Sequence, residues 1–166
     1  MAKIKLKGNP VNTSGELPKI GEQLKDFELV KNDLSRVSLK DFSGSRLVLN
    51  IFPSIDTGTC AASVRMFNKK AAELKNTKVL CISRDLPFAQ ARFCGVEGIE
   101  NAITLSDFAT GNFGKKNNLE ITDGPLAGLH SRSVIVVDEK GRIIYTEQVP
   151  EIVDEPNYEA ALKSLQ

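Results

Sequence analysis

The chain has 166 residues, 41% of them hydrophobic and 26% charged, a composition typical of one globular domain spanning residues 1–166. Its 22 Lys and Arg against 21 Asp and Glu leave a net charge of +1, which argues against a nucleic-acid or acidic-membrane partner. No apolar run approaches the roughly 18 residues of a membrane span, and the N-terminal sequence lacks the apolar core of a signal peptide. A cytoplasmic protein is therefore expected.

The first 25 residues are polar and rich in turn residues. We expect a short strand over residues 3–7 and a hairpin return near 16–18. Weak alternation of apolar residues predicts two further short strands over 27–30 and 37–39. The nearly continuous apolar run over 46–52 then predicts a strand that is buried on both faces.

A helix is predicted directly after this strand. Thr57 is a good N-cap residue for it. One apolar stripe follows at spacings of three and four residues, formed by Cys60, Val64, Phe67, Ala71 and Leu74.

The middle of the chain predicts a strand over 78–83 and then a helix of about nine residues. Asp85 suits the cap of that helix, Pro87 its first turn and Gly95 its exit. A strand over 99–105 is expected after it, and then a short helix over 108–116.

The last third begins with an apolar run over 133–137, which gives the strongest strand signal in the chain. A turn over 138–141 leads back into a strand over 142–146, and a helix over 156–165 closes the sequence. This order predicts parallel pairing with an antiparallel edge, as in an α/β thioredoxin-like fold with an N-terminal extension. A flavodoxin-like sheet would need more parallel strands and would lack the late hairpin.

Three cysteines are the residues with chemistry to explain: Cys60, Cys81 and Cys94. Their odd number argues against a secreted disulfide scaffold, and one histidine without a close cysteine pair argues against a zinc site. Cys81 lies between apolar residues and is expected to be a core residue. Cys60 alone could equally be a small buried residue of the helix stripe.

Cys60 lies at the N-terminus of its helix, where backbone amides favour an anion. A thiol with a pKa near 8.5 is only about 3% ionised at pH 7, and a helix terminus changes that pKa by less than about one unit. An activated thiolate therefore needs a cation nearby. Spacing alone leaves five candidates open, which are His130, Arg65, Arg84, Arg92 and Arg132.

Three separated motifs in the right order carry a resemblance to a known family. Residues 53–60 have the spacing P-x-x-x-T-x-x-C, which resembles the peroxidatic motif of the peroxiredoxins. The surrounding residues 50–65, together with 83–94 and 131–134, more closely resemble the bacterial thiol peroxidases, which are atypical 2-Cys peroxiredoxins. Gly58 stands where many members have proline. The resemblance covers nearly the whole chain and implies a thioredoxin-like fold of the peroxiredoxin type, with an N-terminal β-hairpin extension.

The resemblance implies a role for each of five residues. Cys60 would attack the peroxide and become a sulfenic acid, and Thr57 would place its hydroxyl beside the sulfur. Arg132 would favour the thiolate and stabilise charge developing on the peroxide. Pro53 would shield the site from water. Cys94 would resolve the sulfenic acid as an intramolecular Cys60–Cys94 disulfide; otherwise Cys94 is a core thiol or part of a static disulfide.

The same resemblance implies an enzyme that reduces hydrogen peroxide and organic hydroperoxides in antioxidant defence. Thioredoxin would recycle the disulfide, the protein would be a homodimer with an interface near the active-site loops, and no metal, haem or flavin would be needed. A thiol–disulfide oxidoreductase would usually carry C-x-x-C, which is absent. A redox sensor that changes shape through the Cys60–Cys94 couple is the alternative of a different class.

The predicted helix that carries Cys94 is too short to be stable without packing, and two glycines follow the cysteine closely. Local unfolding should therefore be easy there. We expect the reduced and oxidised forms to differ mainly in residues 57–62 and 88–98. His130 is expected to be structural.

Overall fold

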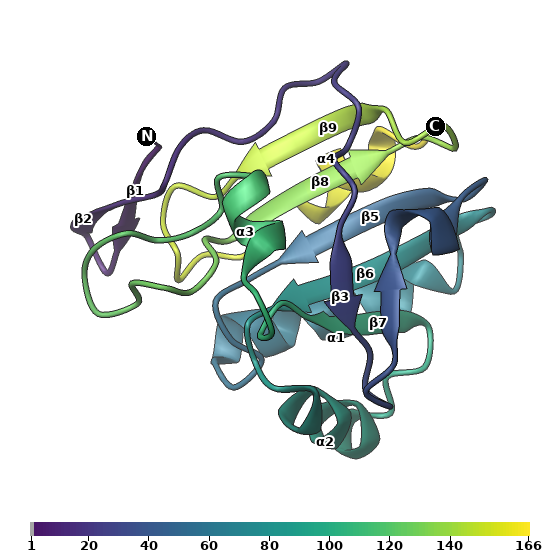
Figure 1. The fold of residues 1–166 in the computed structure, drawn as a ribbon, viewed down its shortest axis with the longest axis horizontal. Helices are drawn as coiled ribbons and strands as arrows, with labels where there is room; N and C mark the ends of the chain where they lie inside the picture. The colour runs from purple at the N-terminus through teal and green to yellow at the C-terminus, as the bar shows by residue number, and fades with distance from the viewer. Residues whose placement is uncertain (1) are drawn as a thin grey trace.

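The computed structural model describes residues 2–166 as a seven-stranded mixed sheet, with helices on both faces and a separate two-stranded hairpin beside it (Figure 1). The strand order in the large sheet is β4-β3-β7-β6-β5-β8-β9. The strands are β1 (Lys3–Leu6), β2 (Asn9–Asn12), β3 (Glu28–Val30), β4 (Arg36–Ser38), β5 (Arg46–Ile51), β6 (Thr77–Ser83), β7 (Ala102–Ser106), β8 (Ser133–Val137) and β9 (Ile143–Gln148).

The central strands confirm the predicted topology. β5, β6 and β7 are parallel, whereas β8 pairs antiparallel with β5 and continues into the hairpin with β9. In the antiparallel pair, Ile51 at the end of β5 lies opposite Ser133 at the start of β8. Because of this register, the residues that follow β5 and those that precede β8 meet at the same end of the sheet.

The helices are α1 (Gly58–Ala71), α2 (Pro87–Glu97), α3 (Asn112–Lys116) and α4 (Tyr158–Lys163), with a 3₁₀ turn over Leu39–Phe42. Apolar residues of α1 and α4 pack with β5, β6 and β8 in one core cluster. A second cluster, which includes Phe113 of α3 and Phe27, covers the opposite face. Figure 1 shows α1 and α4 behind the sheet and α3 in front of it. Within residues 2–166, no helix combines the length and the apolar character needed to cross a membrane.

The N-terminal hairpin is present, but the predicted return near residues 16–18 is wrong. The return strand is β2, and Lys3–Leu6 pairs directly with it. Lys7 and Gly8, with φ of 51° and 82°, form the two-residue turn between them. Positive φ at both central positions gives a turn that matches the twist of a hairpin, so the chain reverses much earlier than expected.

The predicted limits of α2 are also wrong. Leu86, and not Asp85, is the N-cap, and the helix runs for 11 residues to Glu97, with Gly98 as its C-cap. Gly98 has a φ of 65°, the left-handed conformation that glycine adopts readily at a helix end, whereas Gly95 lies inside the helix. The Asp85 carboxylate is engaged with another loop and is therefore not available to cap α2.

α3 is shorter than the predicted helix over 108–116. Gly111 takes the N-cap position with a φ of 71°, and the residues before it form a turn that follows β7. The early glycine thus delays the start of the helix to Asn112.

Candidate active site

Cys60 lies in the first turn of α1, immediately after the loop that leaves β5. Its side chain is fully buried, with 0% exposure. The Nη2 atom of Arg132 lies 3.3 Å from the Cys60 Sγ atom and donates a hydrogen bond to it. A permanent cation in contact with a buried sulfur at a helix N-terminus favours the negatively charged form of that sulfur.

Arg132 is held rigidly at the start of β8. Its Nε donates a hydrogen bond to the Ile152 carbonyl at 2.7 Å, and its own carbonyl accepts from the Val149 amide and the Gln148 side chain. The Nη1 atom is buried and has no hydrogen-bond partner within residues 2–166. The Arg132 side chain also lines a cavity.

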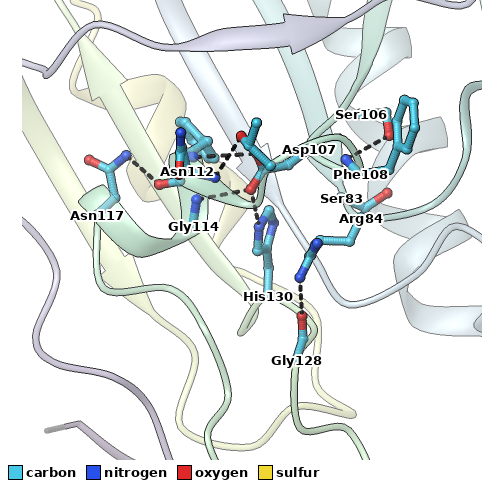
Figure 2. Close-up of polar contacts among 12 residues, drawn as sticks. Ser83, Arg84, Ser106, Asp107, Phe108, Asn112, Gly114, Asn117, Gly128 and His130 are labelled. Carbon is cyan, nitrogen blue, oxygen red and sulfur yellow. Dashed lines mark hydrogen bonds and ion pairs between the residues drawn. The ribbon is translucent and has the colours of Figure 1, made fainter.

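The other three arginine candidates for the cation are engaged elsewhere. Arg65 forms a two-bond ion pair with Glu97, and Arg92 lies 3.4 Å from the Asp56 carboxylate, both at the surface. Arg84 donates a hydrogen bond to the backbone carbonyl of Gly128 (Figure 2). None of these guanidinium groups bonds to a cysteine in the described part of the chain.

His130 also lies away from the sulfur. Its Nε2 atom is 2.9 Å from the Asp107 carboxylate, and both side chains are buried. Figure 2 shows the Asp107 carboxylate between His130 and the first turn of α3, where the Gly114 amide donates to it. A Cβ atom on Gly114 would lie only 2.6 Å from His130 Nε2, so this close packing requires a glycine. His130, in the segment before β8, therefore bonds to the segment between β7 and α3, a position that fits the structural role expected for it.

A cavity of about 590 Å³ with a mostly apolar lining lies beside the residues that surround Cys60, although the buried Cys60 side chain does not itself line it. Pro53, Thr57 and Arg132 are part of its lining. Three distant segments contribute further lining residues: the β1–β2 hairpin, residues 125–126 and residues 152–153. A larger hollow of about 760 Å³ lies between α1 and α4, but its lining includes none of Pro53, Thr57 and Arg132. Among the described residues, no three His, Cys, Asp or Glu side chains gather closely enough to hold a metal ion.

Thr57 is the N-cap of α1, as predicted, but its side chain does not cap the helix. The Thr57 hydroxyl instead donates a hydrogen bond to the Ser54 carbonyl at 3.1 Å. A hydroxyl that donates its one proton in a hydrogen bond can still accept hydrogen bonds through its lone pairs. The Thr57 oxygen can therefore accept a hydrogen bond from a molecule in the cavity.

The Asp85 carboxylate holds the loop between Pro53 and Thr57 against the end of β6. It accepts hydrogen bonds from the Ile55 amide and the Ser54 hydroxyl, both at 2.7 Å, and from the Ser83 hydroxyl at 2.5 Å. Three donors on one carboxylate make a strong attachment. This contact fixes the loop that leads into Cys60.

Cys94 and Cys81 are free thiols, as is Cys60. Cys94 is half-buried on α2, and its Sγ lies 3.4 Å from the Thr104 hydroxyl on β7. No hydrogen bond joins Cys94 to Cys60 among residues 2–166, so the structure does not bring these two together. Cys81 is fully buried in β6, and burial raises the pKa of its thiol to about 12. The prediction that Cys81 is a core residue is confirmed.

The comparisons with known proteins agree with this geometry. The family model described as Redoxin matches residues 19–162. The chain belongs to the redoxin family. It is 57% identical to a thiol peroxidase of Corynebacterium glutamicum over 165 residues, which are 99% of each chain.

Solved structures show the same redoxin fold. A peroxiredoxin-like protein from Aquifex aeolicus matches with a TM-score of 0.92 and 35% identity, covering 98% of this chain and 95% of that one. A thiol peroxidase from Chromobacterium violaceum matches with a TM-score of 0.91 and 24% identity, covering 99% and 95%. The predicted resemblance to thiol peroxidases, the thioredoxin-like fold with its N-terminal hairpin, and the prediction of a thiol-dependent peroxidase are confirmed.

Some parts of this redoxin site were not predicted from the sequence. Asp85 stood inside a motif that resembled the family, but helix-capping rules assigned it to α2 rather than to the loop before Cys60. The Ile152 carbonyl, which orients Arg132, is a backbone group and leaves no mark in the sequence. The apolar lining residues Leu126 and Val153 lie on loops whose meeting point depends on the tertiary fold.

Proposed function

We propose that Cys60 is the peroxidatic nucleophile of a peroxidase that reduces hydrogen peroxide and organic hydroperoxides in antioxidant defence. The observation that carries the proposal is the 3.3 Å contact between the Arg132 guanidinium and the buried Cys60 sulfur. The thiolate attacks one oxygen of the hydroperoxide, the O–O bond breaks, and the other oxygen leaves as an alcohol or water after it takes a proton. Cys60 then carries a sulfenic acid.

Two neighbouring side chains support this attack. The unpartnered Nη1 of Arg132 is available to stabilise the charge that develops on the leaving oxygen. The Thr57 hydroxyl oxygen can accept a hydrogen bond from the O–H of the hydroperoxide and so orient it. Pro53, which is buried beside them, keeps bulk water from the sulfur.

The shape of the cavity supports organic hydroperoxides as substrates. Its lining includes Leu6, Leu126, Ile152 and Val153, so an alkyl group can pack against them while the O–O group lies near Arg132. Hydrogen peroxide is small and uncharged and would use only the part of the cavity beside Arg132.

Cys94 is proposed to resolve the sulfenic acid. Its thiol condenses with Cys60–SOH, which forms the Cys60–Cys94 disulfide and releases water. Few residues of α2 are buried, since only Pro87 and Gln90 are fully covered. Local unfolding of α2 can therefore release Cys94 at a low free-energy cost. Thioredoxin is the proposed reductant of the disulfide.

We further propose a homodimer that uses the surface beside the site. Leu86, Phe88 and Phe108 are exposed at the ends of the neighbouring strands β6 and β7. Exposed large apolar residues near one end of a sheet, aromatic ones in particular, are typical of a protein–protein interface. Phe88→Asp should shift the protein to the monomer in analytical ultracentrifugation, whereas Val96→Asp, an exposed position at the other end of α2, should not. A dimer that persists in Phe88→Asp would contradict this interface.

Residues 1–166 are proposed to act as one domain, because both core clusters pack on the same sheet. The cytoplasmic location expected from the sequence stays a prediction. Cell fractionation with an antibody against the protein would test it.

Thiol counting tests the peroxidase cycle directly. One equivalent of peroxide should remove two of the three thiols and leave Cys81, and a thioredoxin system should then sustain turnover. Cys60→Ser should lose all reaction with peroxide, whereas Cys94→Ser should keep one round of Cys60 oxidation and lose disulfide-dependent recycling. Full activity of Cys60→Ser would overturn the assignment, and stoichiometric oxidation without turnover would favour the redox sensor.

A further inference from the structure

The surroundings of Cys94 contain a chain of three side chains from three elements. The Cys94 Sγ on α2 lies 3.4 Å from the Thr104 hydroxyl oxygen on β7. That hydroxyl donates a hydrogen bond to the Asn32 Oδ1 atom at 2.8 Å, and Asn32 lies in the turn between β3 and β4. These residues also line a small surface cavity of about 270 Å³. The Cys94 thiol of α2 is thus connected through Thr104 to the turn between β3 and β4.

The donor and the acceptor of each hydrogen bond among these three side chains follow from the number of protons that the hydroxyl carries. A threonine hydroxyl has one proton, and here that proton goes to Asn32. Only its lone pairs remain for the sulfur, so Cys94 must be the donor and must carry its own proton. A thiol held in this way is a poor nucleophile, since the thiolate is the attacking species.

The turn that carries Asn32 is itself well ordered. The Lys31 amide bonds to the Ser35 carbonyl, and the Asp33 carboxylate accepts from both the amide and the hydroxyl of Ser35. These bonds lower the pKa of Asp33, so the turn keeps its bonds at neutral pH. Asn32 is therefore a fixed acceptor against which Thr104 can be oriented.

Few other polar contacts attach α2 to the rest of the protein, although Phe93 packs against the core and Arg92 lies 3.4 Å from the Asp56 carboxylate. Gln90 is its buried anchor and donates to the Ser83 hydroxyl and to the Leu105 carbonyl. Toward its C-terminal end, Glu97 pairs with Arg65 at the surface. The bond between Cys94 and Thr104 lies between these two anchors, so its loss should favour the opening of α2.

We propose that Asn32 and Thr104 are positioning residues that hold Cys94 as a protonated thiol in folded α2, and thereby set how fast it reaches oxidised Cys60. This inference rests on the proposed role of Cys94. When α2 opens, the S–H···O bond breaks, and Cys94–SH and Cys60–SOH form the disulfide and water. While α2 stays closed, a second hydroperoxide can oxidise Cys60–SOH to the sulfinic acid, with the hydroperoxide reduced to alcohol or water. The Cys94–Thr104 hydrogen bond thus affects how much Cys60 sulfenic acid becomes disulfide and how much becomes sulfinic acid.

The first test measures Cys94 without any peroxide chemistry. In the Cys60→Ser chain, iodoacetamide should alkylate Cys94 slowly, while Cys81 stays unreactive inside the sheet. Adding Thr104→Val, which keeps the size but removes the hydroxyl, should speed alkylation about two- to tenfold, the effect of one lost hydrogen bond. Thr104→Ser should restore the slow rate. Thr77→Val, a matched change on β6, should leave the rate unaltered. An unchanged rate in Thr104→Val would overturn the proposal.

The second test fixes the direction of the chain. Asn32→Ala frees the Thr104 proton to bond to the sulfur, which favours the thiolate, so the midpoint of the alkylation pH profile should fall. A chain that ran from the Asn32 amide through Thr104 to the sulfur would lose thiolate support instead, and the midpoint would rise. A rise would therefore overturn the assignment of Cys94 as donor.

The third test connects the bond to turnover. With Cys60 restored, Thr104→Val should give more disulfide and less sulfinic acid at high peroxide concentration, as measured by mass spectrometry. Faster alkylation without any change in these products would mean that Cys94 is not the resolving residue. That result would overturn the proposed function but not the hydrogen-bonded chain, so the two failures can be told apart.

Discussion

Arg132 and Cys60, separated by 72 positions in the chain, meet in the core with Nη2 and Sγ 3.3 Å apart. Arg132→Met should slow the oxidation of Cys60 by peroxide about 100- to 1,000-fold, because it removes the charge that stabilises both the thiolate and the leaving oxygen. Arg132→Lys should react at a rate between those of the parent chain and Arg132→Met. Lysine keeps the charge but lacks the rigid fork that also binds Ile152. Single-turnover oxidation, quenched by alkylation, would measure this. Arg36→Met, which breaks an exposed ion pair with Glu28, is the control, and equal rates in all three variants would refute the role of Arg132.

Asp85→Asn should slow peroxide reduction without changing the cavity lining. The amide cannot accept all three hydrogen bonds that the carboxylate accepts, so the loop before Cys60 should loosen. The free energy of unfolding should fall by about 1–3 kcal/mol, as for other hydrogen bonds to charged groups. Urea unfolding and single-turnover kinetics on the same samples would measure both effects. An unchanged rate in the variant would show that the loop does not depend on Asp85.

Val153→Ser should affect organic hydroperoxides more than hydrogen peroxide. Val153 lines one wall of the cavity, and removing the methyl groups that a bound alkyl group would cover should lower kcat/KM for cumene hydroperoxide about 4- to 15-fold. Hydrogen peroxide, which does not reach that wall, should react nearly as before. Ile20→Ser, at an exposed position outside the cavity, is the control. Equal losses for both substrates would contradict the proposed alkyl site.

Glu151 should connect the stability of the N-terminal hairpin to pH. Its carboxylate accepts from the Gly8, Lys7 and Val153 amides, and these bonds hold its pKa below the ordinary value of 4.5. The carboxylate therefore stabilises the folded chain at neutral pH, and this contribution is lost as the pH falls below 4.5 and through the lowered pKa. Glu151→Gln should melt below the parent chain at about pH 7, and the difference should shrink near pH 3. A difference that is independent of pH would exclude the charge as the cause.

Oxidation should increase hydrogen exchange in α2 and at the start of α1. Disulfide formation requires Cys94 to leave Thr104, so residues 88–98 and 57–62 should lose protection. The strands β5 and β8 should keep theirs. Hydrogen exchange by mass spectrometry on the reduced and oxidised protein would detect this. Equal protection of both segments in the two forms would contradict the local unfolding of α2.

The sequence predicted the elements that carry strong patterns and missed those that depend on distant partners. The apolar runs of β5, β6 and β8 identified the buried strands, and the resemblance pointed to Cys60, Thr57 and Arg132. The hairpin return was misplaced because Lys7, a residue that seldom adopts positive φ, forms half of the turn. Asp85 was misassigned because its partners on the loop before Cys60 lie about 30 positions away.

The antiparallel register of β5 and β8 has a consequence for the chain during its synthesis. Ile51 pairs with Ser133, so the Arg132 guanidinium reaches Cys60 only after β8 has docked beside β5. A nascent chain that ends anywhere before Arg132 carries Cys60 as an ordinary thiol, without its cation. The sulfur therefore gains its cation only when β8 is already paired with β5 in the sheet.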